Sequence, residues 1–221
     1  MNSGNPAPDG LPEDSAVHEG AAGARVDDLD QRLAAAVERM GHVTRTMLLR
    51  QAYAEGVSPL QHQLLLRVRA LDGRARGSDL ATELDVSQAT ASEALSALRR
   101  KELVEKVQDP ADRRNVVYSL TASGEELSER LTQWDGPLTA RLGEVPEADK
   151  ATTLRVLLGL VADLHGEGVV SVARTCLTCV FFADGSAGTG LPYRCDLLQV
   201  DFDDAHLRVD CAEHQPRSAA S

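Results

Sequence analysis

Residues 84–106 read LDVSQATASEALSALRRKELVEK, and this stretch decides the fold. Residues 85–87 predict a tight turn after a short helix over Ser78–Leu84, and Ser87 is a favourable N-cap for a second helix. The second helix runs to about Lys101, and its apolar residues recur at the spacing of a buried helical stripe. Two helices joined by a tight turn, with a polar outer face on the second, predict a helix-turn-helix. The residues expected to point inward are Ala91, Ala94 or Leu95, and Leu98.

The pattern changes from helical to strand-like after this pair of helices. Apolar residues over 103–107 and 116–120 flank the charged loop DPADRR at residues 109–114, which predicts two short strands joined as a hairpin. A charged hairpin directly after a helix-turn-helix makes a winged helix. The expected fold is therefore mainly α with a small β-wing, followed by a small irregular or β module that contains the cysteines.

The outer face of this predicted unit carries the residue types that duplex DNA requires. A helix in the major groove contacts base edges through short donors and acceptors, and its first N–H groups can face a phosphate. A wing contacts the DNA backbone or the minor groove through basic residues at its tip. Such patterns also occur in helical proteins whose polar faces are simply solvated, and the pattern alone leaves that alternative open. The candidate DNA-binding residues are Ser87, Gln88, Thr90, Ser92, Arg99, Arg100, Arg113 and Arg114.

A family resemblance rests on the same residues. Residues 84–106, together with the loop 109–114 at a fixed distance before SLTASG at 119–124, resemble the recognition helix and wing of MarR-family regulators. The chain departs from that pattern at Glu93, which places a negative charge on the recognition helix. It departs again at Glu102, where such chains often have glycine.

The MarR resemblance, which covers roughly residues 26–165, implies a homodimer whose terminal helices form the dimer interface. It implies binding of double-stranded DNA at a pseudo-palindromic operator, as a transcriptional repressor. Asp112 would hold a wing arginine by an ion pair, and an arginine would reach the minor groove. The resemblance also implies a small-molecule effector in a cleft lined by helices over Val26–Ala54 and Ser58–Leu71.

Composition excludes several other classes of protein. The chain has 221 residues, of which 43% are hydrophobic and 26% charged, as expected for a globular protein with a sizeable core. Aromatic residues make up 3%, too few for a platform that stacks single-stranded nucleic acid. No apolar run approaches membrane-spanning length, and the polar N-terminus lacks the features of a secretory signal. We therefore expect a cytoplasmic protein without membrane contact.

The net charge of −11 argues at first against nucleic-acid binding. Its distribution along the chain matters more than its total. Ser58–Thr121 carries ten basic and nine acidic residues, whereas the rest of the chain carries 13 basic and 25 acidic residues. The centre of the chain is therefore basic relative to its flanks.

The chain divides into four parts by composition and periodicity. Residues 1–24 predict a disordered tail, and residues 25–168 predict the winged-helix and dimerisation domain, whose last helix starts at Pro146. Residues 169–215 form a cysteine-rich module, in which short β-prone runs alternate with Gly, Asp and Pro. Residues 216–221 predict a second tail.

The four cysteines have the spacing C-x2-C-x15-C-x15-C, at Cys176, Cys179, Cys195 and Cys211. A C-x2-C pair can bind one metal ion, and the later cysteines can complete a tetrahedron. Disulfides are rare in the cytoplasm, and a module with so little apolar core needs another covalent or metal constraint. We therefore expect zinc in a structural site, because four thiolates leave no open position. His214 follows Cys211 as C-x2-H and is a possible substitute ligand.

Three alternatives stay open at this point. The same cysteines could hold an iron–sulfur cluster, which would make the protein a redox or iron sensor. A thiol–disulfide oxidoreductase built on Cys176 and Cys179 requires a thioredoxin-like context, which the sequence lacks, so we expect no enzyme. The acidic net charge leaves open a winged-helix adaptor that does not bind DNA. Three other histidines are expected to be surface or core residues, and they are His62, His165 and His206.

Overall fold

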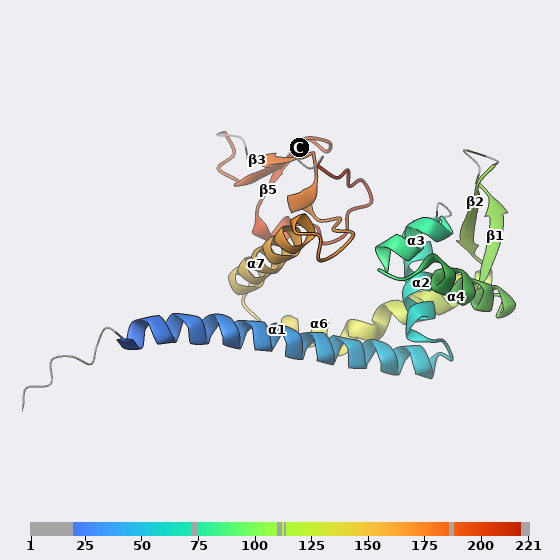
Figure 1. Cartoon of the computed structure of the whole chain (residues 1–221). Helices are drawn as coiled ribbons and strands as arrows, with labels where there is room; N and C mark the ends of the chain where they lie inside the picture. Colours follow the sequence, from blue (N-terminus) through green and yellow to red (C-terminus); the bar gives the residue numbers. More distant parts are fainter. Residues whose placement is uncertain (1–19, 72–74, 110–111, 113, 186–187, 218–221) are drawn as a thin grey trace, which may run out of the picture. The chain divides into compact units, whose positions relative to one another are not determined.

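The computed structural model describes residues 20–71, 75–109, 112, 114–185 and 188–217. The chain divides into two units between Thr46 and Met47. The described part of the first unit is the beginning of helix α1 (Gly20–Ala54). The second unit holds the end of α1, the winged helix and the cysteine module (Figure 1). No helix in the described residues is long and apolar enough to cross a membrane.

Helix α1 begins earlier than the sequence analysis predicts. Residues 20–24, which we assigned to the tail, are helical, and residues 1–19 of the tail lie outside the described residues. Three of these five residues are alanine, the best helix former, which explains the earlier start. The apolar stripe of α1 is between 39% and 57% exposed at Leu29, Leu33, Val37, Met40 and Val43.

The predicted helix-turn-helix is confirmed. Helix α3 (Gly77–Glu83) and helix α4 (Gln88–Arg100) are joined by a turn in which Asp85 has a φ of +49°. The Ser87 hydroxyl caps α4, because it accepts a hydrogen bond from the Thr90 N–H at 3.1 Å. The buried residues of α4 are Ala91, Leu95 and Leu98, and Ala94 is half-buried.

The predicted wing is also confirmed. Strand β1 (Val104–Gln108) pairs antiparallel with strand β2 (Val116–Leu120), directly after the recognition helix. Glu102 lies between α4 and β1 with a φ of +58°, the left-handed region that favours glycine. The departure from the family pattern that we noted at Glu102 therefore falls on a strained backbone position.

Helix α5 (Ala122–Leu131) begins at a cap that also contacts the recognition helix. The Thr121 hydroxyl accepts from the Gly124 N–H at 3.0 Å and donates to the Glu102 carbonyl at 2.6 Å. One side chain therefore joins the start of α5 to the entry of the wing.

The core of the winged helix forms where α2 (Pro59–Ala70), α4 and α5 meet the first residues of β1. Helix α2 starts with a capping box, in which Ser58 and Gln61 exchange hydrogen bonds of 3.2 Å. The buried apolar residues of this core are Ala52, Val57, Leu64, Leu65, Val68, Ala75, Leu80, Leu95, Leu98, Val104, Leu127 and Leu131.

Beyond α5 the chain runs through the short 3-10 helix η1 (Thr132–Asp135), helix α6 (Gly136–Leu142) and helix α7 (Glu147–Gly166). The helical break expected at residues 136–137 is present as the change from η1 to α6. Leu158 of α7 is buried, whereas five other apolar residues of this helix are 38–49% exposed: Val156, Leu157, Leu160, Val161 and Leu164.

The cysteine module has a three-stranded antiparallel sheet with the order β3-β4-β5. Its elements are η2 (Cys176–Thr178), β3 (Phe182–Asp184), β4 (Tyr193–Cys195), β5 (Val200–Phe202) and η3 (Asp204–His206). One aromatic residue from each strand meets the others with ring centroids 5.0–6.1 Å apart: Phe182, Tyr193 and Phe202. This small aromatic cluster is too limited to replace a full core.

The second tail is shorter than predicted. Pro216 forms a β-bridge with Cys179, and the Arg217 guanidinium donates to the carbonyls of Cys179 and Phe182. Residues 216–217 therefore belong to the module, because they complete backbone hydrogen bonding beside the C-x2-C pair. Residues 218–221 lie outside the described residues.

Substitution of Gly124 tests whether the close approach of α5 to Leu103 is needed for stability. A Cβ atom at this position would lie 1.9 Å from the Leu103 carbonyl oxygen. We expect Gly124→Ala to lower the free energy of unfolding by about 3 kcal/mol, measured by urea denaturation. Gly166→Ala is the control, since a Cβ there meets no atom within 4 Å, and its effect should stay within about 1 kcal/mol. Equal stability of the Gly124 variant and the parent would contradict this packing.

The burial of His62 predicts that the free energy of unfolding depends on pH. It is fully buried in α2, and among the described residues neither ring nitrogen has a hydrogen-bond partner. Burial lowers the pKa of His62 below 6.5, and the nearby carbonyls of Leu131 and Leu48 offset this only in part.

The unfolded chain therefore binds a proton at a higher pH than the folded chain does. The folded state is therefore not penalised by His62 above the pKa of the unfolded chain, about 6.5, where the imidazole is neutral in both states. As the pH falls below that value, the unfolded chain takes up a proton and the free energy of unfolding decreases. We expect the melting temperature of the parent to fall more steeply between pH 7.5 and 5.5 than that of His62→Leu. Identical slopes for the two proteins would show that His62 does not titrate on unfolding.

Candidate DNA interface and cysteine site

The polar residues of α4 that we expected at the DNA are all exposed. Ser87, Gln88, Thr90 and Ser92 lie at its N-terminal end, and Ser87 and Thr90 share a hydroxyl hydrogen bond of 2.8 Å. Glu93 is exposed beside them, and Arg99 and Arg100 are exposed at the other end of the helix. The N-terminal half of α4 is therefore free to enter a groove.

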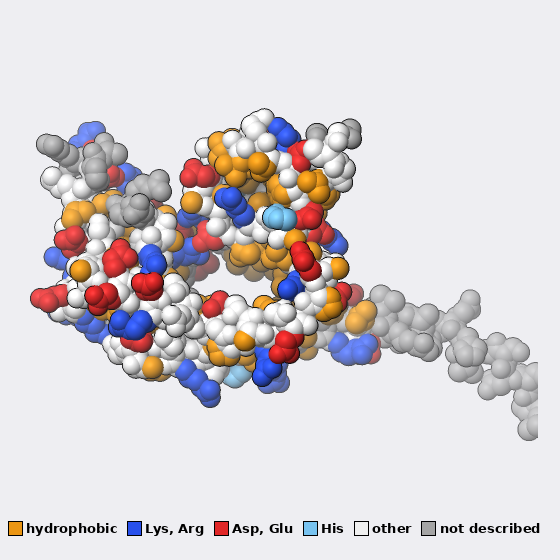
Figure 2. Space-filling view, turned by 180° about the vertical axis from the view of Figure 1, so that it is seen from behind, with side chains coloured by type: hydrophobic (Ala, Val, Ile, Leu, Met, Phe, Trp, Pro, Cys, Tyr) orange, Lys and Arg blue, Asp and Glu red, His pale blue; other side chains and the backbone are white. Residues whose placement is uncertain are grey.

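The start of α4 and the wing line one hollow of about 430 Å³. Gln88 and Ser92 contribute from α4, Ser78 from α3, and Lys106 and Tyr118 from the wing. On the face shown in Figure 2, acidic and basic side chains are intermixed over the winged helix.

Asp112 holds the start of the return strand of the wing through Arg114 and Asn115. Its carboxylate accepts from the Arg114 Nε at 3.3 Å, from the Arg114 backbone N–H at 3.1 Å and from the Asn115 side chain at 3.1 Å. The Arg114 side chain is 92% exposed and extends from the wing. Arg113, the other predicted tip residue, lies outside the described residues.

Sequence analysis missed the ion pair that holds the base of the wing. Arg76, the N-cap residue of α3, donates to the Asp109 carboxylate at 2.8 Å, and the Asp109 residue is buried. This pairing raises the pKa of Arg76 above its ordinary value. Asp109 was visible only as a loop acid in the sequence, since its partner lies 33 positions earlier.

Comparison with known proteins supports the same interpretation of this region. Residues 57–124 match the family described as the winged helix DNA-binding domain. This part of the chain is therefore similar to winged helix DNA-binding domains. Around it, the chain has the fold of a MarR family transcription regulator, SP03579, to which it is 24% identical. That match has a TM-score of 0.56 and covers 66% of this chain and 99% of the other.

Two further proteins are similar to this chain. An uncharacterized HTH-type transcriptional regulator of Bacillus subtilis, YhbI, is 29% identical over 108 residues, which cover 49% of this chain and 70% of the relative. A MarR transcriptional regulator of Methanosarcina mazei is 17% identical, with a TM-score of 0.49, and the match covers 61% of this chain and 99% of that protein. YhbI and SP03579 are both described as transcription regulators.

All four cysteines line a single hollow of about 350 Å³ in the C-terminal module. Cys179 is buried and the other three are half-buried. The remaining walls are largely apolar, and hydrophobic side chains gather on this module in Figure 2. The apolar residues that line the hollow are Phe181, Phe182, Leu197, Leu198, Val200 and Phe202.

Arg208 contacts two of the sulfurs. Its backbone N–H donates to the Cys176 Sγ at 3.2 Å, and its Nη1 lies 3.7 Å from the Cys211 Sγ. Burial raises the pKa of the Cys176 thiol, although the Arg208 N–H works in the opposite direction. Among the described residues, no three His, Cys, Asp or Glu side chains are arranged closely enough to hold a metal ion as they stand.

His214 does not line the cysteine hollow. Its Nε2 lies 2.9 Å from the Thr178 hydroxyl, and its ring borders a different pocket with His165. Burial lowers the pKa of His214. His206 and Glu213 line the cysteine hollow instead, and sequence analysis did not select either as a ligand.

Proposed function

We propose that the chain is a transcriptional repressor that binds double-stranded DNA as a homodimer at a pseudo-palindromic operator. The observation that carries this proposal is the exposed row of short polar side chains on α4, next to the wing of a winged helix DNA-binding domain. Gln88, Thr90 and Ser92 suit base edges in the major groove. Arg114 suits the backbone or the minor groove. The MarR-like fold supports repression and a small-molecule effector, both of which stay predictions.

The exposed apolar stripes support assembly as a homodimer. The stripes of α1 and α7 each expose five large apolar side chains along one helix. Scattered single apolar residues are normal on a protein surface, whereas a contiguous row of them marks an interaction site. A second copy of the chain could bury both stripes, and a two-fold dimer would present two recognition helices to related half-sites.

Operator binding is the direct test of this proposal. We expect the purified protein to elute as a dimer and to shift a duplex from its own upstream region in a gel. Arg114→Ala should weaken binding by about 1 to 2 kcal/mol on every sequence, because it removes a backbone or minor-groove contact. Thr90→Ala and Ser92→Ala should change the base preference as well.

Arg141→Ala is a matched control for the loss of one arginine, since Arg141 pairs with its neighbour Glu144 on an exposed surface. It should bind the operator like the parent. If Arg114→Ala bound as tightly as this control, the assignment of the wing as a DNA contact would be wrong.

We further propose that the four cysteines bind one zinc ion. Four soft thiolate donors around a single hollow fit zinc in kind and in number. Side chains would have to close around the ion, because tetrahedral zinc holds its sulfurs about 3.8 Å apart. Such a centre would be structural and would supply folding free energy that the small aromatic cluster lacks.

One observation favours an iron–sulfur cluster as the second candidate. The hollow of about 350 Å³ has mainly apolar walls and is larger than one ion requires. The hydrogen bonds that Arg208 gives to the sulfurs would also tune the potential of a cluster. In that case the centre would sense oxidants or iron.

Metal analysis of protein purified without air separates these two candidates. We expect one zinc per chain, a colourless solution, and loss of the zinc in Cys179→Ser, whose C-terminal module should unfold while the winged helix stays folded. Brown protein that contains iron and sulfide would show that the site holds an iron–sulfur cluster and not zinc. If protein purified without air contained neither zinc nor iron, that result would contradict any metal centre.

A further inference from the structure

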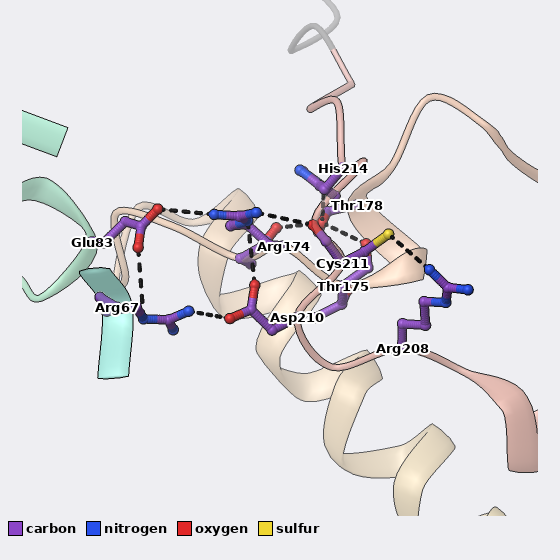
Figure 3. Close-up of polar contacts among 10 residues, drawn as sticks. Arg67, Glu83, Arg174, Thr175, Thr178, Arg208, Asp210, Cys211 and His214 are labelled. Atoms are coloured by element: carbon purple, nitrogen blue, oxygen red, sulfur yellow. Dashed lines mark hydrogen bonds and ion pairs between the residues drawn. The ribbon is translucent and has the colours of Figure 1, made fainter. Parts of the chain in front are cut away.

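Four charged side chains form a closed ring between the helix-turn-helix and the cysteine module (Figure 3). Glu83 pairs with Arg174 at 3.0 Å and with Arg67 at 3.6 Å. Asp210 pairs with Arg174 at 3.3 Å and also with Arg67. We call these four residues the charge ring. Its charges alternate and cancel, so each carboxylate lies between two guanidinium groups.

Glu83 makes the charge ring energetically important. It is the last residue of α3, where the helix dipole disfavours a negative charge, and its side chain is only 12% exposed. A nearly buried carboxylate needs compensating cations, and the second unit supplies them from α2 and from the module. Removal of Arg174 would leave Glu83 with one distant partner, Arg67.

The module residues of the charge ring are joined directly to the cysteines. Arg174 exchanges two contacts with Cys211: its carbonyl accepts from the Cys211 N–H at 3.0 Å, and its Nη2 donates to the Cys211 carbonyl at 3.1 Å. Asp210 immediately precedes Cys211, and Arg174 lies two positions before Cys176. A change in position at either cysteine therefore moves a member of the charge ring.

A second contact reaches the turn of the helix-turn-helix. The Ser171 hydroxyl donates to the Asp85 carboxylate, and Asp85 occupies the left-handed position between α3 and α4. The segment that leads into the C-x2-C pair thus touches both the end of α3 and the turn before the recognition helix.

We propose that the cysteine site is an effector site, and that the charge ring transmits its occupancy to the helix-turn-helix. Zinc loading fixes the segments around Cys176 and Cys211, keeps Arg174 on Glu83 and so holds α3 and α4 in the arrangement that binds DNA. Loss of zinc releases Arg174 and lowers operator affinity. This inference rests on the proposed function, and it adds a regulatory role to a site that was otherwise structural.

Operator affinity of the zinc-loaded and the chelator-stripped full chain tests this coupling. We expect the loaded parent to bind about tenfold more tightly, within the usual range for coupled sites. By reciprocity, operator DNA should raise zinc affinity by the same factor, which a chelator competition measures. In Arg174→Ala and in Glu83→Gln the difference between loaded and stripped protein should fall below about twofold.

Two variants keep the test interpretable. Glu83→Gln lies outside the module and should bind one zinc like the parent, so its loss of coupling cannot come from an unfolded module. Arg155→Ala removes another arginine pair, that between α7 and Asp204 at 3.1 Å, but touches no member of the charge ring. It should retain the full tenfold difference.

Hydrogen exchange of residues 77–87 gives a readout that needs no DNA. Zinc should slow exchange there in the parent and in Arg155→Ala, but not in Glu83→Gln. Equal exchange in loaded and stripped parent, or the same zinc effect in Glu83→Gln, would overturn the coupling. A parent that binds operator equally well with and without zinc would also overturn it, while the proposed function would stand. A parent that binds no operator in either state would instead contradict the proposed function, and exchange alone would then decide the coupling.

Discussion

The backbone contact between Leu103 and the first turn of α5 is the constraint on which the winged helix depends. Gly124 allows α5 to approach the Leu103 carbonyl more closely than any side chain would permit. Thr121 caps α5 and bonds to Glu102 at the same place. Recognition helix, wing and α5 therefore meet at one point, and their relative directions follow from it.

The helix-turn-helix and wing were predictable because their determinants are local. Ser87, the turn at residues 85–87 and the capped start of α5 each act within four residues, and they gave helix ends close to those observed. Helix α1 began six residues earlier than expected, because the pattern analysis weighed apolar periodicity above the alanines at its start. Residues 216–217 were missed because their partners lie about 35 positions earlier.

In the candidate sites, too, the features set by local spacing were predictable, whereas those set by distant partners were not. Exposure of Gln88, Thr90 and Ser92 follows from helical spacing, and the gathering of the cysteines around one hollow was expected from their spacing. The Arg76–Asp109 pair and the charge ring were not predictable, since a sequence does not reveal which distant charges meet. The position of His214 away from the hollow was equally hidden, because C-x2-H spacing allows its ring to turn toward Thr178.

The hydrogen bonds of Arg217 have a consequence for the order of assembly during synthesis. The core of the winged helix is complete once Leu131 has left the ribosome, whereas the C-x2-C loop acquires the backbone partners at Arg217 only about 85 residues later. A nascent chain therefore has a folded winged helix for several seconds before its cysteines are enclosed. During that interval the thiols are open to solvent, and the cysteine module folds only after the winged helix has formed.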